Sequence, residues 1–109
     1  MSESKLQTDC YTWFHNTFPD HRGLLCYNLN NSKNRIDGAR NRAMGLQPGR
    51  SDMVLYHQGR AIMIEMKTEK GNQTTKQKQW QQLIEDHGFE YEVIRSLESF
   101  QQLIKQVIE

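Results

Sequence analysis

The segment PGRSDMVLYHQGRAIMIEMK, Pro48–Lys67, has the pattern of a β-hairpin whose outer ends are charged. Met53–Tyr56 and Ala61–Met66 are apolar runs, and the turn-length sequence HQGR between them predicts two antiparallel strands. Asp52 begins the first strand, and a glutamate and a lysine end the second. Strand interiors disfavour aspartate, and buried charges need partners. The hairpin therefore has either a solvated charged rim or a functional site.

Alternation of side chains along the strands brings these charges together. In an antiparallel hairpin the start of the first strand lies beside the end of the second, so we expect Asp52 close to Glu65 and Lys67. The intervening apolar side chains would point into the core on the opposite face: Ile62, Ile64 and Met66. Two adjacent carboxylates repel each other unless a proton or a cation bridges them. The pattern indicates a divalent-cation site, and a surface ion pair is the alternative interpretation.

The rest of the chain predicts an α/β fold in a single domain that covers residues 1–109. Helices are expected at Glu3–Thr17, at Thr75–His87 and after a Ser96 cap, and further strands at Leu24–Leu29 and Tyr91–Ile94. The polar segment 30–49 has room for one short helix around Asp37–Met44. The order α-β-β-β-α-β-α implies a mixed central sheet of about four strands flanked by helices.

Positive charge is concentrated in one segment, although the formal net charge of the chain is only +1. Residues 31–50 carry a local net charge of +4, and their basic side chains are Lys33, Arg35, Arg40, Arg42 and Arg50. A stripe of this kind can follow a phosphate backbone. A solvated basic loop is the alternative, but this stripe leads directly to Asp52.

Composition excludes several classes of protein. No apolar run approaches the roughly 20 residues of a membrane span, and the N-terminus lacks the features of a signal peptide. Cys10 and Cys26 are therefore expected as reduced thiols of a cytoplasmic protein without a membrane partner. The aromatic residues Trp13, Phe14 and Trp80 have helical spacing with other apolar residues, which favours core packing over base stacking. The hydrophobic content of 36% indicates a small hydrophobic core. A second subunit that covers further apolar surface is therefore plausible.

Four stretches of the chain resemble, in order, the motifs of one nuclease family. They are SESKLQ, GLQPGRSDMVL, IMIEMKTEKGNQTTKQKQWQQLIEDHG and YEVIRSLESFQQLI. Asp52 followed by Glu65-Met66-Lys67 is similar to the PD-(D/E)xK nuclease signature. The whole set resembles the VRR-NUC family of that superfamily, in its compact stand-alone form from phages and bacteria. Ser51 stands where many members have proline or a small residue, and its hydroxyl is expected to be tolerated.

The resemblance implies a restriction-endonuclease-like core and a metal-dependent active site. Asp52 and Glu65 would bind Mg²⁺ together with the backbone carbonyl of Met66, and Mn²⁺ would be able to substitute. Lys67 would be the catalytic lysine, which orients the attacking water and stabilises developing negative charge. The basic side chains of the stripe would bind the DNA backbone.

Further residues receive roles from the resemblance, each beside an ordinary alternative. Gln77 would be the glutamine that contacts the catalytic lysine or the substrate, or an exposed residue of a glutamine-rich helix. Glu3 would match an N-terminal acid that reaches the metal in some members, or it is a first-turn acid that favours the helix dipole. Gln7, one turn later, is a rival for that contact. Asn28 and Asn30 fall near the site in the family arrangement, or are turn residues.

The implied activity is a structure-selective DNA endonuclease that leaves a 5′-phosphate. Small members of the family resemble junction resolvases, so four-way (Holliday) junctions are the expected substrate and a homodimer the expected assembly. The location would be the cytoplasm of a bacterium or of a phage-infected host, and no protein partner can be inferred. Flap cutting, nicking and other phage DNA processing remain open. A catalytically inactive DNA-binding or assembly module is the non-enzymatic alternative.

Overall fold

The computed structural model of the protein describes residues 1–29 and 34–109. Its elements are α1 (Glu3–Thr17), the 3₁₀ helix η1 (Pro19–His21), β1 (Leu25–Tyr27), α2 (Arg35–Ala43), β2 (Met53–His57), β3 (Arg60–Met66), α3 (Thr75–Asp86), β4 (Glu90–Ile94) and α4 (Leu97–Ile108). Over the described residues, no helix combines the length and the apolar composition needed to cross a bilayer.

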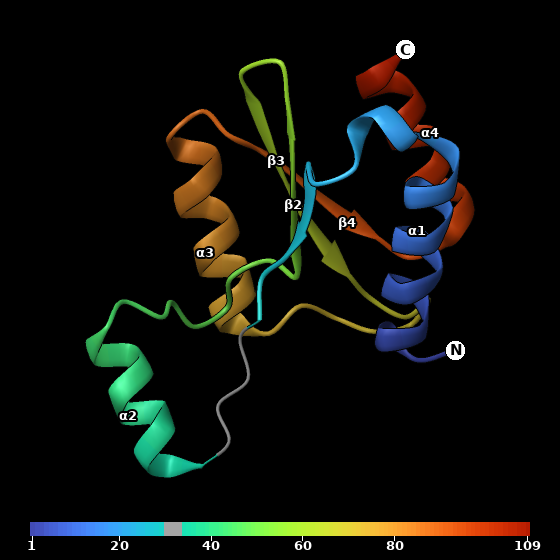
Figure 1. Cartoon of the computed structure of the whole chain (residues 1–109). Helices are drawn as coiled ribbons and strands as arrows, with labels where there is room; N and C mark the ends of the chain where they lie inside the picture. Colours follow the sequence, from blue (N-terminus) through green and yellow to red (C-terminus); the bar gives the residue numbers. More distant parts are fainter. Residues whose placement is uncertain (30–33) are drawn as a thin grey trace.

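The strands form one mixed sheet in the order β1-β2-β3-β4, which confirms the predicted fold class. The first three strands pair antiparallel, and β3 pairs parallel with β4. Figure 1 shows α1 and α4 on one face of the sheet and α3 on the other. The start of β2, the end of β3 and the start of α3 lie at the same end of the sheet (Figure 1). The charged ends of the hairpin therefore meet beneath the first turn of a helix.

The hydrophobic core lies between the sheet and the α1–α4 pair. Its largest fully enclosed side chains include Phe14 of α1 and Phe100 of α4, packed on alternate residues of β2 and β3. The ring of Trp13 meets the ring of Phe100 edge-on at 6.1 Å, as core packing predicted. Burial of such large apolar side chains is the main favourable term in folding. Trp13 and Trp80 are both half-buried, but Trp80 of α3 packs against Tyr91 instead of this core cluster.

The two cysteines are free, as expected. Burial, and then the charge of Asp9, raises the pKa of the Cys10 thiol to about 12. The thiol therefore stays protonated at neutral pH and packs in the core as a small apolar group.

Helix α2 carries the basic stripe and stands apart from the sheet (Figure 1). It starts at Arg35, two residues earlier than expected, because the Asn34 side chain accepts a hydrogen bond from the Asp37 N–H and caps the helix. Its apolar residue Ile36 and the Met44 that follows its last turn are 71% and 72% exposed. The stripe residue Lys33, like Asn30, lies outside the described residues.

The loop that leads from α2 to Asp52 packs tightly against the start of α3 at Gly49. A Cβ added to Gly49 would lie 2.4 Å from the backbone carbonyl carbon and oxygen of Lys76 and 2.8 Å from the Gln77 nitrogen. The φ of Gly49 is +80°, a region that other residues adopt only with strain. Glycine is therefore required here for two separate reasons.

Gly49→Ala is expected to lower the free energy of unfolding by about 1–3 kcal/mol or more, because it adds a backbone clash to left-handed strain. Chemical denaturation measures this change. Gly45→Ala is the matched control, because Gly45 has a φ of +105° but nothing within 4 Å of an added Cβ. Equal destabilisation of the two variants would show that the packing of the loop on α3 contributes nothing to the free energy of unfolding.

Candidate active site

Asp52 and Glu65 face each other at the open end of the β2–β3 hairpin. The ladder ends with the pair Met53↔Ile64, and one further step of the same register places Asp52 opposite Glu65. Asp52 Oδ2 accepts a hydrogen bond from the Met66 N–H at 2.6 Å. The side chain of Asp52 thus bridges to the strand that carries the second acid.

The charges at the end of β3 are inside the protein rather than on a solvated rim. Glu65 is 0% exposed and Lys67 is 6% exposed. The other face of the strand is buried as predicted, with Ile62, Ile64 and Met66 in the core. An exposed ion pair, the alternative that the sequence left open, does not describe residues with this burial.

The two oxygens of the Glu65 carboxylate have unequal surroundings. Oε1 accepts a hydrogen bond from the Tyr91 hydroxyl at 2.5 Å and another from Gln73 Nε2 at 3.2 Å. Oε2 is buried and has no hydrogen-bond partner among the described residues. A buried carboxylate oxygen without a partner is costly, so this atom marks a place where a missing partner would bind.

Burial also keeps Tyr91 in its donor form. Burial, followed by the hydrogen bond to Glu65, raises the pKa of the Tyr91 hydroxyl far above its ordinary value. The phenol therefore remains protonated at any pH at which the protein would work, and donates to Glu65.

The Asp52 carboxyl is held in an environment that disfavours its ionised form. Burial is the main reason that the pKa of Asp52 lies above its ordinary value, and the hydrogen bond from Met66 opposes this shift. The negative charges of Glu65 and Glu3 raise the pKa further, whereas Lys67 lowers it. A carboxyl whose pKa is raised by burial and by neighbouring charges, as that of Asp52 is, is typical of functional sites.

The N-terminal helix therefore contributes to the site electrostatically. Glu3, in the first turn of α1, lies near enough to act on the Asp52 charge. Its role as a metal ligand stays a prediction. Gln7, the proposed rival, lines a cleft beside β1 with Tyr11 and Tyr27.

Hydrogen bonds fix the backbone on both sides of Asp52. The Asn28 N–H donates to the Asp52 carbonyl at 2.8 Å, and the Asn28 side chain donates to the Ser51 carbonyl at 3.3 Å. The Ser51 hydroxyl is fully buried and donates to the Met53 carbonyl at 3.1 Å. The serine is thus accommodated, and Asn28 acts as a support for the loop.

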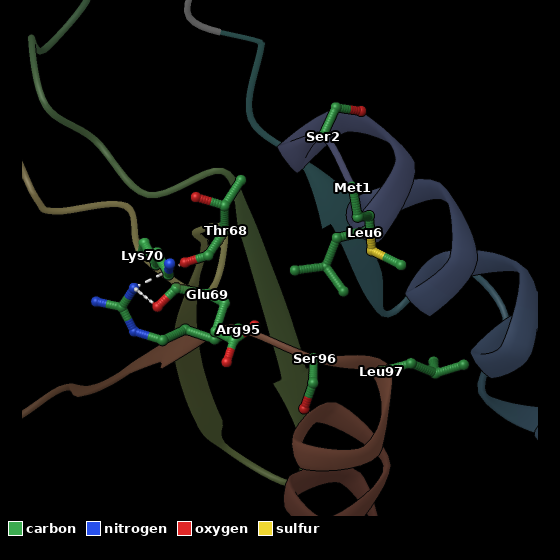
Figure 2. A pocket seen from close by; sticks show the side chains of 9 residues that line it. All are labelled: Met1, Ser2, Leu6, Thr68, Glu69, Lys70, Arg95, Ser96 and Leu97. Carbon is green, nitrogen blue, oxygen red and sulfur yellow. Dashed lines mark hydrogen bonds between the residues drawn. The ribbon is translucent and has the colours of Figure 1, made fainter.

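The backbone around Lys67 is held by the β4–α4 junction. The Lys67 N–H donates to the Ile94 carbonyl at 2.9 Å. Arg95 then donates through Nη1 to the carbonyls of Thr68, at 2.8 Å, and Gly71, at 2.6 Å. Figure 2 shows this guanidinium reaching the loop beside a pocket of about 420 Å³, to which the start of α1 also contributes. The chain directly after Lys67 is therefore tied down.

The glutamine beside the buried carboxylate is Gln73, which the sequence did not single out. Gln73 Nε2 also donates to Gln81 Oε1 at 2.8 Å, so two glutamines line this side of Glu65. Gln77 instead closes the capping box of α3, where its Oε1 accepts from the Thr74 N–H at 2.8 Å. The role of Gln77 at the lysine or the substrate stays a prediction.

The donor set fits a hard divalent ion. Over the described residues, no group of three or more His, Cys, Asp or Glu side chains could hold a metal. Mg²⁺ needs no such cage, because it uses one or two carboxylates and keeps several waters. The unpartnered Glu65 Oε2 and the neighbouring Asp52 offer that sparse pair.

The basic stripe lies on a surface that leads to the site. Its described side chains, all of them exposed, are Arg35, Arg40, Arg42 and Arg50. Arg50 follows Gly49, which packs against Lys76 of α3. The exposed lysines Lys76 and Lys78 extend the basic surface along the first turn of α3, an extension that the sequence pattern alone did not reveal.

Comparison with known proteins identifies the family and the fold of this chain. The VRR-NUC domain matches residues 3–98. A solved structure described as a VRR_NUC domain protein superposes with a TM-score of 0.78 at 19% identity, over 99% of this chain and 88% of that chain. At that identity the likeness establishes the fold. No curated protein gives a significant match. Because the family match runs from the first residue of α1 into the first turn of α4, this chain belongs to the VRR-NUC family of nuclease domains.

Proposed function

We propose that the protein is a metal-dependent, structure-selective endonuclease that hydrolyses phosphodiester bonds in branched DNA. The family supports a nuclease with DNA as its substrate. The observation that carries the metal dependence is the buried Glu65 Oε2, which lacks a partner among the described residues and lies across from Asp52. An inactive binding module would have no use for two acids held together at this energetic cost.

Asp52 and Glu65 would hold Mg²⁺, or Mn²⁺ in its place, together with the Met66 carbonyl. When bound, the ion supplies activation of a water and neutralisation of charge on the phosphate. Lys67 lies close enough to act on the Asp52 charge, and its ammonium group can orient the attacking water. Hydrolysis would leave a 5′-phosphate, as the family resemblance implies.

The basic stripe supports DNA binding through the backbone rather than through the bases. Arginines on α2 and Arg50 can contact phosphates on the path to the site. Such binding is salt-sensitive and largely independent of sequence. Selectivity would then come from the shape of the DNA.

A homodimer acting on four-way junctions is the form of this activity that the family resemblance favours. Exposed apolar side chains occur near β1 and on or beside α2, and they include Tyr27, Leu29, Ile36 and Met44. Covering them in a two-fold assembly would also place two active sites on one branched substrate.

Asp52→Asn and Lys67→Ala are each expected to reduce cleavage of a labelled four-way junction by roughly 100-fold or more, because the first removes a metal ligand and the second removes a positive charge near the reacting phosphate. The assay compares junction, flap and linear duplex substrates with Mg²⁺, with Mn²⁺ and with EDTA. Asp20→Asn and Lys105→Ala are matched controls on exposed residues outside the site. Paired, metal-dependent cuts on the junction are the expected result.

Two outcomes would contradict the proposal. Binding without cleavage of any substrate would indicate an assembly module of the same fold. Preferred cutting of flaps or single nicks would retain the nuclease and replace the junction as its substrate.

Asp52→Asn is also expected to stabilise the metal-free protein at neutral pH. The raised pKa of Asp52 means that its contribution to stability is present below the unfolded-state pKa and is lost as the pH rises through the folded-state pKa. The ionised carboxylate therefore destabilises the fold at pH 7, and an amide removes that cost. Thermal unfolding in EDTA should show a Tm higher by several degrees, since about 1 kcal/mol shifts Tm by roughly 4–8 °C in a domain of this size.

The same thermal unfolding measurements are then repeated with Mg²⁺. The ion should raise the Tm of the natural protein and leave that of Asp52→Asn unchanged, because only the former has both ligands. A lower Tm for the metal-free variant would show that the carboxylate stabilises the fold.

Replacing Arg35, Arg40 and Arg42 together with alanine is expected to weaken DNA binding. It should also reduce the slope of the logarithm of the association constant against the logarithm of salt concentration, by about 1 for each phosphate that the variant no longer binds. Titrations of a junction at several salt concentrations measure this slope. Arg60→Ala is the control, because Arg60 lies at the hairpin turn in an exposed pair with Glu90. An unchanged slope in the triple variant would place the DNA elsewhere.

A further inference from the structure

The carboxylate of Glu65 is oriented by two donors from other parts of the chain. Both bonds end on the same oxygen, Oε1, at 2.5 Å from the Tyr91 hydroxyl and 3.2 Å from Gln73 Nε2. The other oxygen is also buried and receives no hydrogen bond from the described residues. Rotation of the carboxylate group would otherwise exchange its two oxygens. The two donors therefore determine which oxygen is hydrogen-bonded and which one has no partner among the described residues.

Tyr91 is itself held firmly in place. It lies on β4, where the parallel register pairs Met63 with Tyr91 and Glu65 with Val93, so the tyrosine shares a sheet face with the glutamate. Its side chain is buried, and its ring lies 6.0 Å from that of Trp80 on α3. The hydroxyl is therefore fixed between sheet and helix, with its proton directed at Glu65.

Gln73 is the second donor and comes from the loop before α3. Its amide donates to Glu65 and, at 2.8 Å, to Gln81 Oε1 further along the helix. Gln81 accepts with its oxygen, which sets the orientation of the Gln73 amide. A chain of hydrogen bonds thus runs from α3 through the loop to the buried acid.

We propose that Tyr91 and Gln73 are positioning residues that hold Oε1 of Glu65, so that Oε2 is the atom presented to the metal ion. The proposal rests on the proposed function. It assigns to these two side chains a role in metal affinity rather than in the bond-breaking step. Groups that orient a metal ligand typically change metal affinity by about 10–100-fold when removed.

The experiment measures Mn²⁺ binding to the full chain by electron paramagnetic resonance, without DNA. Tyr91→Phe keeps the ring against Trp80 and removes only the hydroxyl, whereas Gln73→Ala removes the second donor. Tyr56→Phe, an exposed tyrosine on β2, and Gln79→Ala, an exposed glutamine on α3, are matched controls. Circular dichroism establishes that each protein is folded at the temperature of the measurement.

We expect Tyr91→Phe to weaken Mn²⁺ binding by about tenfold or more, Gln73→Ala to weaken it less, and the controls to bind as the natural protein does. Cleavage by Tyr91→Phe should recover at saturating Mn²⁺, with a higher metal requirement and a nearly unchanged kcat. A merely structural role would lower the Tm without moving the metal requirement. If Tyr91→Phe does not fold, Mn²⁺ binding and the metal requirement of Gln73→Ala test the proposal in its place.

Two results would overturn the inference, and they are distinguishable. Mn²⁺ binding at natural affinity in folded Tyr91→Phe and Gln73→Ala, with binding abolished in Asp52→Asn, would remove the positioning role and leave the metal site in place. No Mn²⁺ binding by the natural protein would overturn both the inference and the proposed metal dependence.

Discussion

The pairing register of β2 and β3 is the constraint on which both the core and the site depend. With Met53 opposite Ile64, the apolar residues of β3 enter the core, and the next step outward brings Asp52 to Glu65. A slip by one residue would turn every side chain of the strand to the other face. The hydrophobic effect that holds Ile62 and Ile64 inside therefore also determines where the two acids meet.

That arrangement confines like charges at the end of a buried strand, and the surrounding groups offset only part of the cost. The Met66 N–H bonds one oxygen of Asp52, and the Tyr91 hydroxyl bonds one oxygen of Glu65. The second Glu65 oxygen is left without a partner in the described chain. Natural proteins tolerate such local cost at functional sites, where stability elsewhere in the fold compensates. The core between α1, α4 and the sheet supplies that stability here.

Helix α3 closes the site, although none of its residues is fully buried. The Thr74–Gln77 capping box begins the helix, and the close packing of Gly49 on Lys76 ties it to the loop that carries Asp52. Trp80 packs on Tyr91 from the α3 side of the sheet. The helix thus covers the acids, and the lysines of its first turn are exposed to solvent. The positive charge that would bind DNA therefore lies next to the site.

Local pattern in the sequence was sufficient to predict the helices, the hairpin, its buried face and the acids at its open end, because period and turn chemistry depend on near neighbours in the chain. The family resemblance supplied the roles of Asp52, Glu65 and Lys67. Only the tertiary structure decided which groups surround them. Tyr91 is 26 residues from Glu65 and hydrogen-bonds to it. Gln73, from the loop before α3, also reaches this carboxylate, whereas the Gln77 oxygen takes part in the cap of α3. Hydrogen-bond partners of a buried group are set by how separate segments dock, and no periodicity within one segment encodes that contact.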